Sequence, residues 1–206
     1  MNELILVRHG QADHMVTGRT GGWSDSHLTE LGRRQAKATG PAVAAILKDR
    51  PFAFYSSDLA RAAETAEILA GSLPAAPRLA FGLREHGNGA AANLTVEEAE
   101  KIATPTERPT IDWVPYPGAE SWRQMSERVY GFLDAVADEA ELFLLVSHAN
   151  AGVAVVHWWL GLGEQAWSKI SFEFDLCSIT RLTENDWGER TIRKLNDTSH
   201  LVELKA

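Results

Sequence analysis

The feature that most constrains the fold is a short apolar run near the start of the chain that stops abruptly at a cation and an imidazole. Residues 4–7 read LILV, the composition of a buried β-strand, and Arg8, His9 and Gly10 follow at once. In α/β proteins, ligands bind in the crevice beyond the carboxyl ends of the strands. The run therefore predicts a strand that delivers Arg8 and His9 to a functional site.

Strand-like and helix-like segments alternate along the rest of the chain. Short apolar stretches typical of strands recur at residues 53–57, 77–81, 142–147, 178–182 and 191–195. Helical patterns lie between them, over residues 27–40, 58–71, 120–140 and 149–160, and a further helix is expected to start at Thr95. The alternation predicts an α/β fold with a mostly parallel central sheet flanked by helices.

Local signals indicate where the helices begin and end. Thr29 is expected to cap the first long helix, and Gly40 with Pro41 to end or kink it. Asp58 is expected to cap the next helix, and Gly71 to stop it.

Composition limits the classes of protein to which the chain can belong. A length of 206 residues with 45% hydrophobic residues suffices for one globular domain, which we expect to span residues 1–206. The formal net charge of −8 argues against nucleic acid or an anionic membrane as a partner. No segment reaches the roughly 18 apolar residues of a bilayer-spanning helix, so we expect a soluble, cytoplasmic protein. The single cysteine excludes an internal disulfide, and the absence of CxxC and HExxH motifs predicts no dedicated metal site.

Three further motifs accompany the Arg-His-Gly tripeptide. They are YSSDLARAAETAEIL at residues 55–69, LREHGNG at 83–89 and LLVSHANAG at 144–152. In this order the four motifs resemble the histidine phosphatase superfamily, the phosphoglycerate mutase-like proteins. PGAES and LNDTSHL also resemble family motifs, so the likeness extends from about residue 4 to residue 201. It implies a three-layer sandwich with a mixed sheet between helices, and a site above the strand ends that precede His9 and His148.

Two arginines and two histidines from distant segments of an acidic protein point to a phosphate ligand. The planar guanidinium matches two phosphoryl oxygens, so Arg8 and Arg61 can hold a dianion. His148 stands directly before a predicted helix, so the amide of Ala149 and the positive end of the helix dipole are expected to face the same group. The arginines and His148 would carry the charge stabilisation that Mg²⁺ provides in many other enzymes, so no metal or other cofactor is expected.

The resemblance implies that His9 is the nucleophile. A neutral imidazole can attack phosphorus, and a covalent phosphohistidine divides one difficult displacement into two easier ones. The leaving alkoxide then needs a proton. A carboxylic acid beside a phosphate anion retains its proton more readily, which suits Glu85 to protonating the leaving group and later to activating water.

Each of these residues also has an ordinary structural interpretation. Arg61 could be a solvated helical arginine paired with a neighbouring carboxylate. Glu85 could be an exposed loop carboxylate paired with Arg84, and His148 a core histidine hydrogen-bonded to the backbone. The joint pattern favours the phosphate site, because otherwise several unrelated motifs would have to occur by chance in the same order as in the family.

A second set of residues is expected nearer the rim of the pocket. Gln11 follows the tripeptide closely enough to reach the phosphate through its side chain or amide, although a role in a surface loop is equally open. Residues 20–32 resemble the family's substrate loop, which places near the pocket mouth Arg19, Thr20, Gly21 and Trp23. Family members often carry Asn a few residues beyond the tripeptide, where this chain has Asp13, His14 and Met15, so a secondary phosphate contact stays open.

Three aromatic residues near these motifs have two open interpretations. His86 adjoins Glu85 and could contact substrate, but a solvated loop histidine is the favoured interpretation. Trp113 and Trp122 flank the proline-rich segment and PGAES, where one of them could line a pocket. Packing in the core or the loop is favoured for both.

Three functions fit the pattern. The favoured one is a metal-independent phosphatase that hydrolyses a small phosphorylated metabolite through a phosphohistidine. A phosphoglycerate mutase that depends on bisphosphoglycerate needs the same pocket, but the segment between Glu85 and Pro117 looks too short for an elaborated, water-excluding lid. A non-catalytic phospho-ligand-binding module is the third. The substrate cannot be read from the sequence, and an amphipathic helix or exposed tryptophan could supply a homodimer face.

Overall fold

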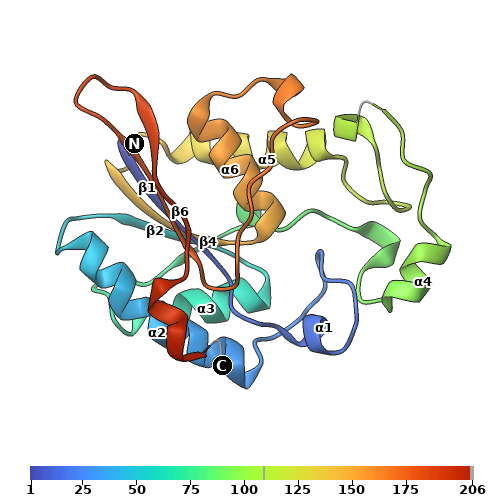
Figure 1. Cartoon of the computed structure of the whole chain (residues 1–206), viewed down its shortest axis with the longest axis horizontal. Coiled ribbons are helices and arrows are strands. Elements are labelled where there is room, and N and C mark those ends of the chain that lie inside the picture. Colours follow the sequence, from blue (N-terminus) through green and yellow to red (C-terminus); the bar gives the residue numbers. More distant parts are fainter. Residues whose placement is uncertain (109, 205–206) are drawn as a thin grey trace.

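The computed structural model describes residues 1–108 and 110–204, which fold around a six-stranded mixed sheet (Figure 1). The strands are β1 (Glu3–Arg8), β2 (Ala53–Ser57), β3 (Arg78–Ala80), β4 (Leu142–Ser147), β5 (Ile179–Glu184) and β6 (Arg190–Asp197). Their order is β3-β2-β4-β1-β5-β6; β1 to β4 run parallel, whereas β5 is antiparallel to β1 and to β6. The prediction of a mostly parallel, mixed α/β sheet is confirmed.

Helices cover both faces of this sheet (Figure 1). They are α1 (Asp13–Val16), α2 (Glu30–Leu47), α3 (Ala60–Ala70), α4 (Val96–Lys101), α5 (Trp122–Val136) and α6 (Ala149–Leu160). α2 and α3 pack on one face, and α5 and α6 on the other, which gives the three-layer sandwich that was expected. None of the helices within the described ranges combines the length and hydrophobicity needed to cross a bilayer.

The continuous apolar run of β1 is explained by its burial on both faces. Leu4 and Leu6 belong to the core under α5 and α6, whereas Ile5 and Val7 belong to the core under α2 and α3. Successive side chains of a strand point to opposite faces, so a strand between two helical layers needs apolar residues at every position. Burial of four such side chains stabilises the fold by roughly 1.5–3 kcal/mol each.

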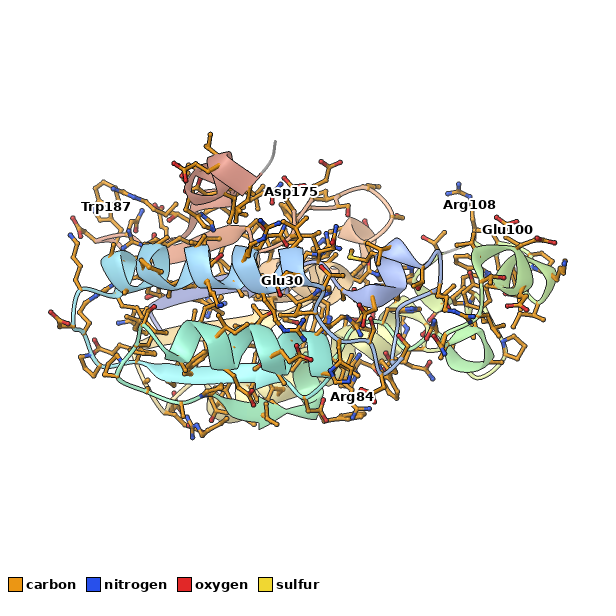
Figure 2. All side chains as sticks on the ribbon, turned by 90° about the horizontal axis from the view of Figure 1, so that it is seen from below. Glu30, Arg84, Glu100, Arg108, Asp175 and Trp187 are labelled. Atoms are coloured by element: carbon orange, nitrogen blue, oxygen red, sulfur yellow. The ribbon has the colours of Figure 1, made fainter. Side chains whose placement is uncertain are left out.

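The two ends of the sheet point toward opposite ends of the long axis of the molecule. Glu100 and Arg108, in and after α4, lie at one end, and Trp187 in the β5–β6 hairpin lies at the other (Figure 2). β1 runs away from that hairpin, toward the end that carries α1 and α4 (Figure 1). The carboxyl ends of the parallel strands therefore face the loops that contain the predicted rim residues.

Of the two outcomes expected at Gly40 and Pro41, an end or a kink of the first long helix, the end is wrong. α2 runs through Pro41 to Leu47, and its buried stripe continues with Val43. A proline inside a helix costs about 3 kcal/mol. Burial of Val43 and Leu47 offsets a cost of that size. The cap at Thr29 is confirmed, because its side chain accepts a hydrogen bond from the amide of Gly32.

The prediction that Asp58 caps α3 is also wrong, although Gly71 does end this helix. The N-cap residue is Leu59, which makes no side-chain cap. Asp58 instead accepts two hydrogen bonds from Arg84, from Nε at 2.7 Å and from Nη2 at 2.8 Å. A bidentate arginine pair is stronger than a neutral cap bond, and here it links the start of α3 to the segment that carries Glu85.

Two glycines bring the end of β1 against the first turn of α2. A Cβ atom on Gly10 would lie 2.6 Å from the carbonyl oxygen of Gly32. A Cβ atom on Gly32 would lie 2.0 Å from the carbonyl oxygen of Gln11. Both neighbours are backbone atoms that cannot move aside, so this approach fixes the position of the chain that follows β1.

We therefore expect Gly32→Ala to destabilise the protein by about 3 kcal/mol, the upper range for overpacking in a rigid site. The matched control is Gly131→Ala on the exposed face of α5, where a Cβ atom meets nothing within 4 Å. That change should stabilise the protein by up to about 1 kcal/mol, because alanine is the better helix former. Urea unfolding of the two variants measures both values. Equal stability of the two variants would contradict the close approach.

Candidate active site

Three functional side chains from separate segments meet at the carboxyl ends of β1 and β4. His9 follows β1, His148 follows β4 as the N-cap residue of α6, and Arg61 belongs to the first turn of α3. The two imidazole centroids lie 5.0 Å apart, and Nε of Arg61 lies 3.2 Å from Nε2 of His9. All three residues are buried, with exposed fractions of 3% for His9 and 1% for Arg61 and His148.

The hydrogen bonds of His9 determine which ring nitrogen carries the proton. Nδ1 lies 2.7 Å from the carbonyl oxygen of Gly10, which can only accept, so Nδ1 carries the hydrogen. Nε2 receives a hydrogen bond from Nε of Arg61, so Nε2 holds a lone pair. Burial and the charges of Arg61 and Arg8 hold the pKa of His9 well below its ordinary value. The ring is therefore neutral near pH 7, and its unprotonated Nε2 faces Arg61.

His148 has the same tautomer as His9, but here Nδ1 is the nitrogen without a partner among the described residues. Nε2 lies 2.8 Å from Oγ of Ser57, which already accepts a bond from the amide of Leu59. The hydroxyl hydrogen of Ser57 can then go to Nε2, which places the ring hydrogen on Nδ1. Nδ1 is buried, and within the described part of the chain it has no partner. Burial, Arg61 and His9 lower the pKa of His148, so this nitrogen is a neutral donor that lacks an acceptor.

The two arginines of the site carry charge that no carboxylate of the described residues balances by an ion pair. Nη1 and Nη2 of Arg61 donate to the carbonyl oxygens of Ser24 (3.2 Å) and Gly22 (2.7 Å). Arg8 donates to the carbonyl oxygen of Phe174, and its buried Nε has no partner in the ranges described. Burial lowers the pKa of Arg8 and lowers that of Arg61 to about 10. Such cations are costly unless an anion joins them.

Glu85 lies at the N-terminus of α6 and is not paired with Arg84, which contacts Asp58. Its Oε1 accepts hydrogen bonds from the amides of His86 (2.9 Å) and Ala151 (3.3 Å). Oε2 accepts one from the amide of Asn150 at 3.4 Å. The positive end of the α6 dipole therefore holds this carboxyl group next to His148.

The Ala149 amide stays a predicted ligand contact. The next two amides of α6, of Asn150 and Ala151, bind Glu85. The Ala149 amide donates no hydrogen bond within residues 1–108 and 110–204. It is therefore the one amide of this first turn that a ligand could still use, while its neighbours position a carboxyl group.

The predicted rim residues divide into two groups. Arg19 donates to the carbonyl oxygen of Asn93 at 2.7 Å, and the Thr20 hydroxyl donates to that of Ala91, so these two fasten the loop to the 91–93 segment. Trp23 lies nearer the site, because its indole nitrogen donates to the carbonyl oxygen of Glu85 at 2.6 Å. Gly21 adjoins Gly22, whose carbonyl oxygen accepts a hydrogen bond from Arg61 at 2.7 Å.

Gln11 braces the loop after β1. Its amide donates to Oε1 of Gln35 at 2.9 Å, and its side-chain oxygen accepts a bond from the Thr29 hydroxyl at 2.8 Å. The amide and the side-chain oxygen are thus used in packing against α2. Of the two interpretations, the role in the loop agrees better with these contacts.

His14 is the main site neighbour to which the sequence assigns no role. Its ring centroid lies 6.4 Å from that of His9, and its Nδ1 lies 2.8 Å from Oγ of Ser26. Burial and the charges of Arg61 and Arg8 lower the pKa of His14 to about 4. One feature of the sequence could have pointed to His14 as a site residue: it lies shortly beyond His9, where the family often has an amide side chain.

The expectation of a solvated His86 is wrong. The residue is 9% exposed, and its ring centroid lies 5.1 Å from that of Trp122, which in turn lies 5.6 Å from that of Trp167. Trp113 donates to the hydroxyl of Thr104 at 3.1 Å, a contact within its own loop. Both tryptophans therefore serve packing, as the favoured interpretation had it.

Cavities of different size lie at the two edges of the sheet. One of about 430 Å³ adjoins Trp23, Asn88 and Glu120, on the side of the buried histidines. A larger one of about 870 Å³ lies at the opposite edge, where the strands β1, β2 and β4 begin. Several of the charges lining the larger cavity are paired, for example Glu3 with Arg50 at 2.7 Å. Chemistry rather than volume therefore identifies the site.

Comparisons with known proteins agree with this geometry. The family model of the histidine phosphatase superfamily (branch 1) matches residues 4–198. The chain is 30% identical over 210 residues to a protein of Salmonella typhi named probable phosphoglycerate mutase GpmB, covering 98% of this chain and 95% of that protein.

Solved structures show the same likeness. A mycobacterial glucosyl-3-phosphoglycerate phosphatase in complex with VO3 has a TM-score of 0.81 at 27% identity, covering 96% of this chain and 100% of that one. A phosphoserine phosphatase of Entamoeba histolytica shares the fold, with a TM-score of 0.76 at 24% identity and coverage of 98% and 100%. Because the family model spans nearly the whole length, the chain belongs to the histidine phosphatase superfamily.

Proposed function

We propose that the protein is a metal-independent phosphoric monoester hydrolase that acts on a small phosphorylated metabolite through a phosphohistidine at His9. The main support is the neutral His9 ring, whose Nε2 lone pair faces the buried guanidinium of Arg61, with Arg8 next to His9 in the chain. Arg8 Nε and His148 Nδ1 are buried donors without acceptors there, judged over the described chain. A phosphoryl dianion supplies both the missing negative charge and the missing acceptors.

The first chemical step transfers the phosphoryl group to the protein. Nε2 of His9 attacks phosphorus with its lone pair while the bond from phosphorus to the ester oxygen breaks. The two guanidinium groups and Nδ1 of His148 donate to the nonbridging oxygens, where charge spreads in the transition state. The departing oxygen takes a proton from the carboxyl group of Glu85.

The second step returns His9 to its starting state. Glu85, now a carboxylate, takes a proton from a water molecule whose oxygen attacks the phosphohistidine. The bond between phosphorus and nitrogen breaks, and inorganic phosphate leaves with the lone pair restored to Nε2.

Hydrolysis is favoured over phosphoryl return to substrate. The chain is 27% identical to the mycobacterial phosphatase over 96% of its length. Both ends of the segment between Glu85 and α5 are tied to α5, because the Gly87 amide donates to Glu120 at 2.8 Å and Arg128 of α5 donates to Glu120 at 2.8 Å. Water reaches the site unless a lid closes over it.

A mutase is the second candidate, favoured by the 30% identity to the protein named probable phosphoglycerate mutase. Incubation with a phosphoglycerate and a catalytic amount of bisphosphoglycerate separates the two activities. We expect phosphate release to be faster than isomerisation. Isomerisation that outpaces release would favour the mutase.

We expect wild-type protein to release phosphate from monoesters in the presence of EDTA, and His9→Ala to lose at least about a thousandfold of this activity. Denaturation in alkali should trap a single phosphoryl group on the wild-type chain, detected by mass spectrometry and mapped to His9. His27→Ala is the matched control, because His27 is an exposed histidine paired with Glu64. Activity that survives in His9→Ala, or a phosphoryl group on another residue, would reject the proposal.

The lowered pKa values of His9 and His148 predict how the protein responds to acid. Both rings should stay neutral at pH 6 in nitrogen NMR spectra, whereas His27, whose pKa is raised by its hydrogen bond to Glu64, should be protonated.

The same two pKa values predict a loss of stability in acid. The unfolded chain binds a proton at each histidine near pH 6.5 and the folded chain does not, so the free energy of unfolding falls as pH drops below 6.5. The slope should be about 1.4 kcal/mol per pH unit for each ring. Urea unfolding at several pH values measures the slope, which should decrease in a His9→Gln, His148→Gln double variant. An unchanged slope would contradict the assignment.

A further inference from the structure

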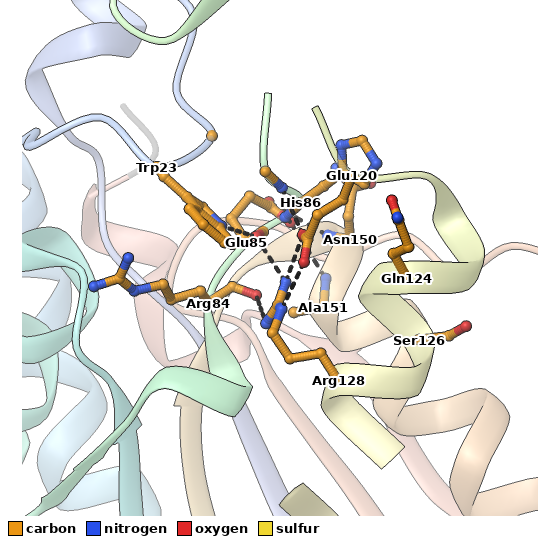
Figure 3. A network of polar contacts seen from close by, with 12 residues as sticks. Trp23, Arg84, Glu85, His86, Glu120, Gln124, Ser126, Arg128, Asn150 and Ala151 are labelled. Atoms are coloured by element: carbon orange, nitrogen blue, oxygen red, sulfur yellow. Dashed lines mark hydrogen bonds and ion pairs between the residues drawn. The ribbon is translucent and has the colours of Figure 1, made fainter. Parts of the chain in front are cut away.

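A largely buried ion pair between Glu120 and Arg128 lies beside Glu85 (Figure 3). Arg128 of α5 donates from Nε to Oε1 of Glu120 and from Nη2 to Oε2, each at 2.8 Å. The two side chains are only 10% and 15% exposed. Such a fork-to-fork pair holds both groups in one orientation.

The ion pair forms hydrogen bonds to the backbone on both sides of Glu85. Nη1 of Arg128 donates to the carbonyl oxygens of Gly82 (2.9 Å) and Arg84 (3.0 Å). Nη2 donates to the carbonyl oxygen of Glu85 itself at 3.1 Å. On the other side, Oε2 of Glu120 accepts the amide of Gly87 at 2.8 Å. The peptide groups before and after Glu85 are therefore fixed to one rigid salt bridge (Figure 3).

Trp23 adds a contact from the rim loop to the same point. Its indole nitrogen donates to the carbonyl oxygen of Glu85 at 2.6 Å, so this oxygen accepts two hydrogen bonds. The guanidinium carbon of Arg128 lies 5.6 Å from the centroid of the Trp23 ring. The loop, the ion pair and the backbone of Glu85 thus form one unit.

The carboxyl group of Glu85 is held less firmly than its backbone. Two of its three amide contacts are long, at 3.3 Å from Ala151 and 3.4 Å from Asn150. The position of the Glu85 carboxyl group therefore depends mainly on the position of its backbone. A shift of about 1 Å in a reacting group can cost about a hundredfold in rate.

We propose that Glu120 and Arg128 are positioning residues for proton transfer by Glu85. They touch neither the phosphoryl group nor the leaving group; they set the distance from the Glu85 carboxyl to the departing oxygen. The proposal rests on the role of Glu85 in the proposed function. It predicts that disruption of the pair impairs only those reactions that need the proton.

The test compares two esters that differ in their need for an acid. Alkyl phosphates require protonation of the departing oxygen, whereas dinitrophenyl phosphate releases a stable anion without it. For Glu120→Gln we expect kcat/KM to fall about tenfold to a hundredfold with the alkyl ester and to change less than about twofold with the dinitrophenyl ester. Because kcat/KM reports the step in which the leaving group departs, slow hydrolysis of the phosphohistidine does not obscure the result.

Companion variants separate positioning from general damage to the fold. Arg128→Lys keeps the charge but removes the bidentate contact, so it should show the same selective loss. Glu139→Gln, which breaks the exposed pair with Arg78, should leave both esters unaffected. In a Glu85→Gln background, Glu120→Gln should cause no further loss with the alkyl ester, since the group that it positions is already gone.

Two results would overturn the positioning role. One is an equal loss with both esters in Glu120→Gln and Arg128→Lys, as a merely structural pair would give. The other is full activity of both variants with the alkyl ester. Wild-type protein that turns over neither ester would instead contradict the proposed function, so the two failures are distinguishable.

Discussion

Parallel pairing of β1 with β4 is the constraint on which the site depends. Arg8 lies opposite Ser147 in this register, so both strands end at the same edge of the sheet. The amide of His9 then donates to the carbonyl oxygen of Ser147 at 3.0 Å. Residues 9 and 148, far apart in the chain, are held together by a ladder whose strands are buried on both faces. A binding site built on such strands has little freedom to move.

Uncompensated positive charge follows from this arrangement. Arg8 and Arg61 lie in the buried crevice without a carboxylate in direct contact, among the ion pairs of the described residues. Burial, and next the field of these arginines, lower the pKa of both histidines and keep the rings neutral. The same field favours a dianion. One set of charges therefore prepares both the nucleophile and its substrate, at a cost in stability that ligand binding relieves.

Sequence reasoning succeeded where a local signal carried the information. The apolar run of β1, the cap at Thr29 and the helix at Ala149–Leu160 appear in the structure as expected, because side-chain chemistry and spacing decide them locally. It failed in part at Pro41, where it allowed the helix to end, whereas burial of the following turn carries the helix on to Leu47. It failed again at His86, which a loop context alone made look solvated although Trp122 covers it.

The sequence by itself determined the α/β class, the family resemblance and the identity of His9, Arg8, Arg61, Glu85 and His148 as candidates. These follow from residue types and their order, which do not depend on how the side chains pack. Only the tertiary structure decided which nitrogens of His9 and His148 carry hydrogen, and that Glu85 binds the first amides of α6. It also decided that the salt bridge between Glu120 and Arg128 forms. These features arise from distances between segments that are remote in the chain, and no local pattern encodes such distances.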